Sequence, residues 1–273
     1  MGNKKIFTKE EKDKVIYLYT VEKRGQLYCA KSIGTSQRKV KEILKEGNIK
    51  IRNFSEASIC SNQNRALFKD KDYFNNQSHN MAWLMGFIAS DGSIGLKDNG
   101  IKIALSLKDK EILEKIKQEV KIENQIREYT TSDGFDCCSI EWACKEHKDA
   151  LREYNIIPQK TFKLLPPDKL KDEYKIDYIR GYFDGDGSVN LIQNKALRWQ
   201  VCSATKPILE FIVDTLYNRF NIPKVNIQTQ KRVHNIYYIQ YSTNATKKIY
   251  DILYTPNSLY LQRKKEHFDE IVK

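Results

Sequence analysis

The sequence predicts an α+β protein made of two copies of one αββαββα unit, preceded by a small all-helical segment. The prediction rests first on two stretches, LMGFIASDG (84–92) and IRGYFDGDG (179–187), in which apolar residues surround a glycine and a small residue precedes Asp-Gly. The segments that follow these stretches also correspond: each alternates between apolar and polar residues and then shows apolar residues at helical spacing. The unit is therefore duplicated.

Residues 1–53 are predicted to form a small three-helix module. Thr8 and Glu11 fit a capping box at the start of the first helix, a second helix covers about 27–33, and Thr35 or Ser36 caps the third. This order resembles a helix-turn-helix, whose last helix enters the major groove of DNA. The third helix would present Gln37, Arg38 and Lys41 to DNA. The alternative is a basic three-helix bundle that binds another kind of partner.

Residues 54–78 are mostly polar and lose the apolar periodicity, which predicts a linker. The first repeat is expected to cover residues 79–167 and the second residues 168–273. Pro166 and Pro167 open the connection between them.

Each repeat begins with a helix that ends in an acid, Asp91 in the first copy and Asp186 in the second, 95 positions later. Small residues four positions apart, such as Gly181 and Gly185, form a stripe along which the two helices can pack closely. Packing along this stripe would bring both acids to the same end, where two carboxylates repel unless a proton or a cation lies between them. Hard oxygen ligands favour Mg²⁺. For one copy, a polar turn after a helix is the simpler explanation, but two copies in equivalent positions favour a paired site.

The two stretches resemble the motif of the LAGLIDADG homing endonucleases, in the single-chain form that carries two motifs. The internal glycine, the final acid and the last glycine stand in both copies, while Met85, Ala89 and Arg180 are among the departures from the name-giving pattern. The resemblance covers about residues 79–273 and includes the segments IIPQKTFKLLPP (156–167) and LYLQRKKEHF (259–268). It implies a saddle of two antiparallel sheets over double-stranded DNA, with the motif helices at its centre, in a monomer.

The same resemblance implies that Asp91 and Asp186 hold divalent metal at the scissile phosphates, with the backbone carbonyls of Ser90 and Gly185 as further ligands. Mg²⁺ is the expected ion; Mn²⁺ would substitute for it, and Ca²⁺ would support binding without cleavage. The family also places a basic residue near the metal in each half, and Lys145 matches that position. Asn244 stands opposite it in the second half, which leaves Lys195 and Lys231 as weaker candidates there. The alternative for Lys145 is a solvated charge at the start of a helix.

Several predicted strands alternate between apolar residues and polar residues able to reach base edges in a major groove. A single strand of this kind is more often a plain solvated face, but several such strands beside the duplicated acids favour DNA. The predicted contacts are Lys102, Ser106, Lys108, Gln125, Arg127 and Tyr129 in the first repeat, and Arg198, Gln200, Asn226, Gln228, Gln230, Arg232, Tyr238, Gln240 and Ser242 in the second.

Composition agrees with a polyanionic partner, because the 273 residues carry a formal charge of +12 and the pI is near 9.2. Residues 1–70 contain 16 Lys and Arg against 8 Asp and Glu, so they contribute most of this excess.

The six cysteines are expected to be reduced, and the spacing of Cys137, Cys138 and Cys144 does not predict zinc. We expect a soluble intracellular protein without a membrane partner, because no signal peptide or long apolar run is visible. Neither ATP nor a nicotinamide cofactor is indicated.

The leading hypothesis is an endonuclease that hydrolyses one phosphodiester in each strand of a long, asymmetric DNA site. By resemblance, the cuts would lie close together across the minor groove and leave short 3′ overhangs. A non-cleaving DNA-binding regulator or a maturase that binds intron RNA could use the same scaffold.

Overall fold

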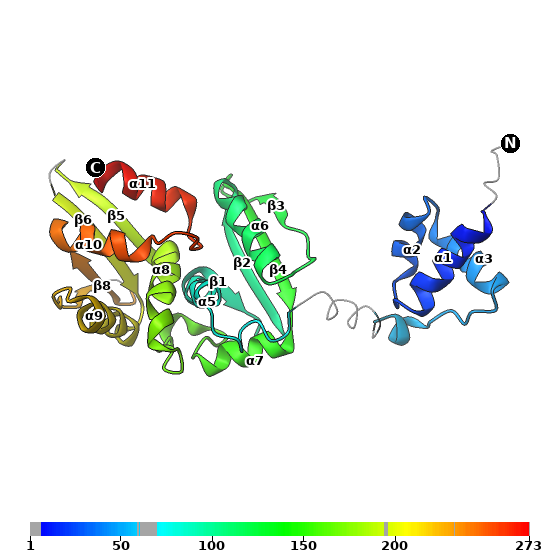
Figure 1. Cartoon of the computed structure of the whole chain (residues 1–273), viewed down its shortest axis with the longest axis horizontal. Coiled ribbons are helices and arrows are strands. Elements are labelled where there is room, and N and C mark those ends of the chain that lie inside the picture. The colour runs from blue at the N-terminus through cyan, green and yellow to red at the C-terminus, as the bar shows by residue number, and fades with distance from the viewer. Residues whose placement is uncertain (1–6, 59, 61–69, 194–195, 232, 273) are drawn as a thin grey trace. The chain divides into compact units, whose positions relative to one another are not determined.

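The computed structural model describes residues 7–58, 60, 70–193, 196–231 and 233–272. The chain divides into two compact units, 1–69 and 70–273, which are described separately (Figure 1). Among the described residues, no helix combines the length and the apolar character needed to cross a membrane.

The first unit contains helices α1 (Lys9–Thr20), α2 (Gln26–Ser32) and α3 (Gln37–Glu46). The capping box predicted at Thr8 is confirmed, since Thr8 Oγ1 accepts from the Glu11 amide and Glu11 Oε2 accepts from the Thr8 amide. Ser36 Oγ caps α3 by accepting from the Lys39 amide. The apolar faces of the three helices meet in a small core that includes Val15 and Leu44, both fully buried. The predicted small helical region is therefore present.

The first repeat of the second unit follows the predicted αββαββα order. Its elements are α5 (His79–Asp91), β1 (Gly92–Ile94), β2 (Gly100–Ser106), the 3₁₀ turn η1 (Leu107–Asp109), α6 (Lys110–Glu119), β3 (Arg127–Thr130), β4 (Asp136–Ala143) and α7 (Lys145–Glu153). Two further 3₁₀ turns, η2 (Lys160–Phe162) and η3 (Asp172–Tyr174), lie in the connection to the second repeat.

The second repeat has the same order and ends with an additional helix. Its elements are α8 (Lys175–Asp186), β5 (Gly187–Ile192), β6 (Ala196–Ser203), α9 (Lys206–Phe220), β7 (Gln228–Gln230), β8 (Ile236–Tyr241), α10 (Thr243–Leu253) and α11 (Gln262–Val272). The duplication seen in the sequence is confirmed as a duplication of structure.

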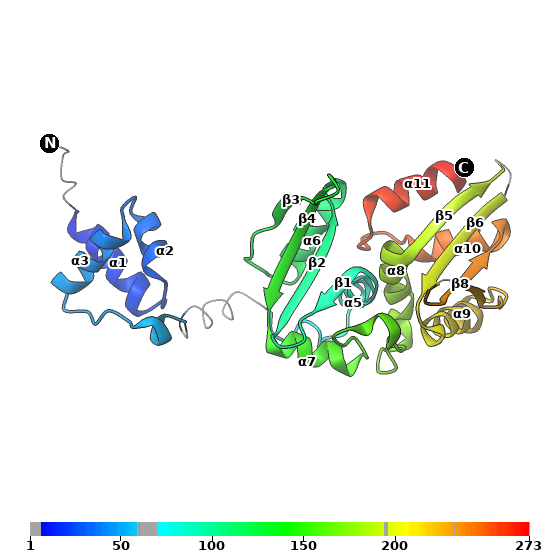
Figure 2. The same ribbon diagram turned by 180° about the vertical axis from the view of Figure 1, so that it is seen from behind.

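Each repeat forms one four-stranded antiparallel sheet, ordered β1-β2-β4-β3 in the first and β5-β6-β8-β7 in the second. Figure 2 shows the strands β2 and β4 in front of α6, and β5 and β6 in front of α10 and α11. Apolar side chains such as Ile140 and Trp199 are buried, while the polar side chains that alternate with them leave the other face of each sheet open.

Helices α5 and α8 pack directly against each other at the centre of this unit. A Cβ atom on Gly86 would lie 2.0 Å from the carbonyl oxygen of Tyr178, and one on Gly181 would lie 1.9 Å from that of Trp83. Only glycine permits such an approach of the two backbones. The predicted contact along the small-residue stripes is confirmed.

The segment from residue 70 to residue 78, expected to be part of the linker, belongs instead to the core of the second unit. Phe74 is fully buried and packs edge-on against His147. Asp70 also belongs to this unit, because its carbonyl oxygen lies 2.5 Å from His147 Nε2. Isolated apolar residues in a polar segment give no periodic signal, so sequence pattern could not find this contact.

Candidate active site and nucleic-acid interface

Asp91 and Asp186 are the last residues of α5 and α8, and β1 and β5 begin at the glycines that follow them. The two helix ends lie side by side: a Cβ atom on Gly185 would be 2.0 Å from Ser90 Oγ and 3.1 Å from the carboxyl carbon of Asp91. The close packing of the glycine stripes thus brings both acids to one end of the helix pair. Both side chains reach solvent.

The surroundings of the two acids raise the pKa of both carboxyl groups. Desolvation raises the pKa of Asp91, although Lys264 and Lys160 oppose this rise. Desolvation and then the charge of Asp91 raise the pKa of Asp186 to about 6. Such a pair is stabilised by a proton or a cation placed between the carboxylates.

Two lysines from outside the motif helices reach the ends of these helices. Lys160 Nζ, in η2, donates to the carbonyl oxygens of Gly92 at 2.6 Å and Ser90 at 3.3 Å. Lys264 Nζ, in α11, donates to the carbonyl oxygens of Phe183, Gly185 and Gly187 at 2.6–2.9 Å. Each lysine therefore binds carbonyl groups left open at the end of a motif helix and places a positive charge beside the acids.

Burial lowers the pKa of both lysines. Desolvation lowers the pKa of Lys264 to about 8, against the opposing charges of Asp184 and Asp91. Desolvation also lowers the pKa of Lys160, against Asp186 and Asp91. The two acids and two lysines are thus one electrostatic cluster.

Lys145 is not part of this cluster, which corrects the sequence-based expectation. It is exposed at the start of α7, and its ammonium pairs with Asp149 Oδ2 at 3.0 Å, one helical turn away. The side-chain hydrogen bond to Asp149 raises the pKa of Lys145. Lys231 is exposed next to β7, Asn244 is exposed in the first turn of α10, and Lys195 lies outside the described residues.

The donor set suits Mg²⁺ in the manner typical of phosphate-binding sites. Among the described residues, no cluster of three or more His, Cys, Asp or Glu side chains is present. Mg²⁺ commonly uses one or two carboxylates and completes its shell with water and substrate phosphates, so two exposed aspartates are sufficient. The carbonyls of Ser90 and Gly185 already accept bonds from the lysines, and each retains one lone pair. Their role as ligands stays a prediction.

The polar residues predicted on the second sheet share its open face. Gln200 lies opposite Gln240 in the register, and Gln240 Nε2 donates to Gln200 Oε1 at 2.5 Å. Tyr238 lies opposite Gln228 on the neighbouring strand. Since directly opposed residues of an antiparallel pair point to the same side, the register combines these residues with Arg198 and Gln230 into one polar surface.

The first sheet presents a similar, smaller polar surface. Lys102 and Ser106 alternate with buried isoleucines along β2, and Arg127 and Tyr129 lie on β3 at the far edge of the sheet. The register through β4 places all four on the same side.

Several other predicted contacts lie outside the strands, because the ladder hydrogen bonds end before them. Gln125 and Asn226 precede β3 and β7, Lys108 lies in η1, and Ser242 is the N-cap residue of α10. All four are exposed. Arg232 falls outside the described residues, and Gln37, Arg38 and Lys41 are exposed on α3.

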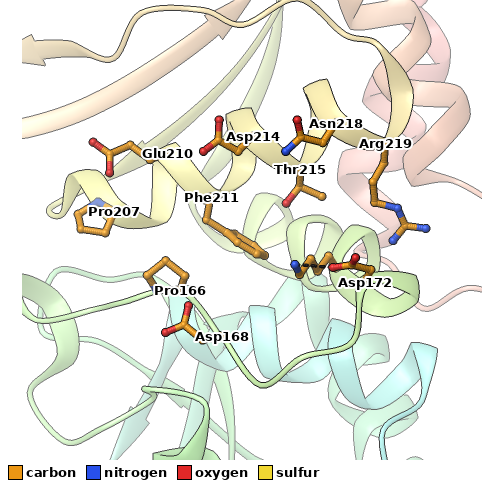
Figure 3. Close-up of a pocket in the computed structure, with 11 residues that line it drawn as sticks. Pro166, Asp168, Asp172, Pro207, Glu210, Phe211, Asp214, Thr215, Asn218 and Arg219 are labelled. Carbon is orange, nitrogen blue, oxygen red and sulfur yellow. Dashed lines mark ion pairs between the residues drawn. The ribbon is translucent and has the colours of Figure 1, made fainter.

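A pocket of about 440 Å³ lies between α9 and the connection that leads to α8 (Figure 3). Its lining includes four carboxylates, from Asp168, Asp172, Glu210 and Asp214, and two cations, Lys175 and Arg219. Lys175 pairs with Asp172 at 2.5 Å. The acidic balance of this pocket does not suit a polyanion, in contrast to the open sheet faces.

The profile of the family described as "LAGLIDADG-like domain" matches residues 78–153 and 173–253, more than half of the chain and one segment in each structural repeat. The chain belongs to the LAGLIDADG family. An uncharacterized protein of Methanocaldococcus jannaschii is 25% identical over 168 residues, which cover 55% of this chain and 54% of that protein. The chain therefore spans about half the length of this curated relative.

Solved structures with a similar fold are more distant in sequence. Full-length DUF199/WhiA from Thermatoga maritima is 16% identical with a TM-score of 0.47, and the match covers 74% of this chain and 63% of that one. The LAGLIDADG meganuclease I-CpaMI bound to uncleaved DNA is 16% identical with a TM-score of 0.49, over 71% and 91% of the two chains. The meganuclease I-SmaMI bound to uncleavable DNA is 13% identical with a TM-score of 0.48, over 71% and 90%.

Sequence reasoning missed Lys160 and Lys264, although a signal for them was present. The two segments that match the LAGLIDADG pattern outside the motifs, 156–167 and 259–268, each contain one of these lysines. The two segments follow equivalent helices, α7 and α10, so a search for basic residues at equivalent places in the two copies would have found the pair.

Proposed function

We propose that this protein is a site-specific endonuclease that hydrolyses one phosphodiester in each strand of double-stranded DNA. The observation that carries the proposal is the pairing of Asp91 and Asp186 at adjacent helix ends, between two sheets with open polar faces. Family membership supports it, because homing endonucleases share this fold. A monomer has both acids, so one chain suffices for two cuts.

Each half of the protein contributes the same set of functions to the proposed reaction. Asp91 and Asp186 are the residues that would hold Mg²⁺, with Mn²⁺ as a substitute. The bound ion would supply an activated water and a Lewis acid that stabilises the departing oxygen. Lys160 and Lys264 fix the helix ends and add positive charge where phosphates would lie.

The polar surfaces of the two sheets are the proposed reading surfaces. Gln and Asn side chains pair with adenine edges and Arg with guanine edges in a major groove that admits a two-stranded ribbon. The exposed residues of α3 extend the proposed contact with DNA. Because the residues on the two sheets differ, we expect a target with unlike halves.

The test is cleavage of a plasmid library that carries random inserts, with wild type, Asp91→Asn, Asp186→Asn and the control Asp168→Asn, which changes a carboxylate of the acidic pocket. We expect wild type and the control to linearise a subset of plasmids in Mg²⁺. The two motif variants should bind the same DNA in Ca²⁺ but should fail to linearise it in Mg²⁺. A wild type that binds DNA tightly but never cuts it would support a regulator, and tight, selective binding of intron RNA would support a maturase.

A further inference from the structure

Arg263 belongs to neither motif helix nor either sheet, but its charge acts on Asp91. It is the second residue of α11, next to Lys264, and its side chain is 56% exposed. Its guanidinium reaches across to the first repeat, where Nε and Nη2 donate to the two carboxylate oxygens of Asp109 at 3.1 and 3.0 Å. The second repeat therefore contributes a cation to the half of the site that contains Asp91.

Asp109 is buried and holds the guanidinium of Arg263 in a defined position. Asp109 closes η1, directly after β2, and only 5% of its side chain is exposed. A bidentate pair between guanidinium and carboxylate has a defined geometry, unlike a flexible surface contact. The hydrogen bonds to Asp109 raise the pKa of Arg263. The charge of Arg263 in turn acts to lower the pKa of Asp91, against the desolvation that raises it.

The pair to Asp109 leaves part of the guanidinium available. Arginine has five N–H donors, and the two bonds to Asp109 involve Nε and Nη2, so the Nη1 edge faces away from that carboxylate. A second planar or tetrahedral anion can bind this free edge.

Arg263 also lies near the point where the chain leaves β2 and passes through η1 into α6. It lines a pocket of about 270 Å³ whose cations, Lys108, Lys115 and Arg263, are accompanied by the carboxylates of Asp109, Glu111 and Glu266. Lys108 is exposed in η1, two residues after the end of β2. The pocket therefore lies between the segment that follows β2 and the C-terminal segment that contains Lys264.

We propose that Arg263 binds a backbone phosphate of the DNA strand served by Asp91, with Asp109 as the residue that positions it. This inference rests on the proposed function for its substrate, DNA. The equivalent of Arg263 in the first repeat, directly before Lys160, is Gln159, so the second half of the site has no matching arginine from that segment. The contact is asymmetric and affects one strand.

The test compares Asp109→Asn with the double variant Asp109→Asn, Arg263→Ala. Both proteins then lack the buried charge, so the arginine is their only difference and an unpaired buried carboxylate cannot unfold the double variant. Arg219→Ala, which removes an exposed arginine from the acidic pocket, is the matched control in the wild-type background.

The first measurement is the salt dependence of binding to a fluorescein-labelled mixed-sequence duplex in Ca²⁺. Loss of one phosphate contact should reduce the slope of log K against log salt by about 1 in the double variant, while Arg219→Ala keeps the wild-type slope. A merely structural role of Arg263 would not change this slope. A double variant that keeps the wild-type slope overturns the inference, even if cleavage is observed.

The second measurement is nicking of each strand of a cleaved library site in Mg²⁺. The strand that Asp91→Asn leaves uncut should be nicked about tenfold more slowly by the double variant than by wild type, since a hydrogen bond to a charged group contributes on this order. Equal slowing of both strands contradicts a contact to one strand. If wild type never nicks DNA but the salt slope falls as expected, the proposed function fails and the phosphate contact stands. A wild type that binds no duplex overturns both.

Discussion

At the scale of single residues, the two LAGLIDADG motifs differ at the position two before the final acid. The first copy has Ala89 there and the second has Asp184, which is 1% exposed. Asp184 Oδ2 accepts from Trp83 Nε1 at 2.8 Å and from the Leu261 amide at 3.0 Å. Asp184 thus links α5, α8 and the segment that contains Lys264, while its Oδ1 has no hydrogen-bond partner among the described residues.

Asp184→Asn is expected to stabilise the protein above about pH 6. Burial raises the pKa of Asp184 to about 6, so the folded protein holds this proton more tightly than the unfolded chain does. Between about pH 4 and 6 the wild type therefore loses stability as the pH rises, and a rise of about two in pKa limits this loss to about 3 kcal/mol. Asparagine keeps an acceptor for both hydrogen bonds and removes the charge. Urea unfolding with EDTA at pH 5 and pH 8 checks this, and a variant less stable than wild type at pH 8 contradicts it.

The two lysine assignments give opposite expectations for cleavage. Lys264→Met removes the donor to three carbonyl oxygens and a charge beside the acids, so it should lower the cleavage rate by about tenfold or more. Lys145→Ala removes only an exposed partner of Asp149 and should leave the rate unchanged. Single-turnover cleavage of a library-derived site measures both. A large loss with Lys145→Ala alone would restore the assignment made from the sequence.

At the scale of elements, the contact between α5 and α8 determines the position of the acids. Gly181 and Gly86 bring the backbones together, and the acids follow at the helix ends. Other elements only support this arrangement, for example α11, whose His267 Nε2 lies 3.2 Å from the Val189 carbonyl of β5.

Gly181→Ala should destabilise the second unit by about 3 kcal/mol or more. The new Cβ would lie 1.9 Å from the Trp83 carbonyl oxygen, a backbone atom that cannot rotate away, so the helices must separate. Gly25→Ala is the matched control, because nothing lies within 4 Å of its Cβ position. Urea unfolding followed by far-UV circular dichroism measures both. An unchanged midpoint for Gly181→Ala would show that the helices are packed less closely.

Helices and strands could be predicted where the sequence repeats or alternates. Features that depend on tertiary contacts could not be predicted from these patterns. Duplicated motifs located α5 and α8, and alternation located the central strands such as β6. Lys160 and Arg263 could not be placed from periodicity, because they lie in connections or at helix starts and contact residues far away in the sequence. Asp109, for example, is 154 positions from Arg263. Strand ends were also missed, as at Lys108 and Ser242, because the last ladder hydrogen bonds depend on the partner strand.

At the scale of the whole molecule, the charge and the chemistry are divided between the two units. Residues 1–70 carry most of the basic excess, whereas the acids and the buried lysines all belong to the second unit. Each unit has its own core of buried apolar residues. This division predicts that binding strength and cleavage chemistry can be separated experimentally.

Removal of residues 1–69 should leave the second unit folded and able to cleave, but with weaker binding to DNA. The second unit keeps its complete core and the cluster of Asp91, Asp186, Lys160 and Lys264, so its thermal unfolding should match that of the same unit in the full chain. The lost module removes exposed basic residues such as Arg38 and Lys41, and fewer phosphate contacts mean weaker binding and a smaller salt slope.

Hydroxyl-radical footprinting on a cleaved site should show a shorter protected region for the truncated protein. The control is the full chain with Gln37, Arg38 and Lys41 replaced by alanine, which should shorten the footprint at the same end. If truncation leaves both footprint and affinity unchanged, α3 does not bind DNA, and the basic three-helix unit serves another partner.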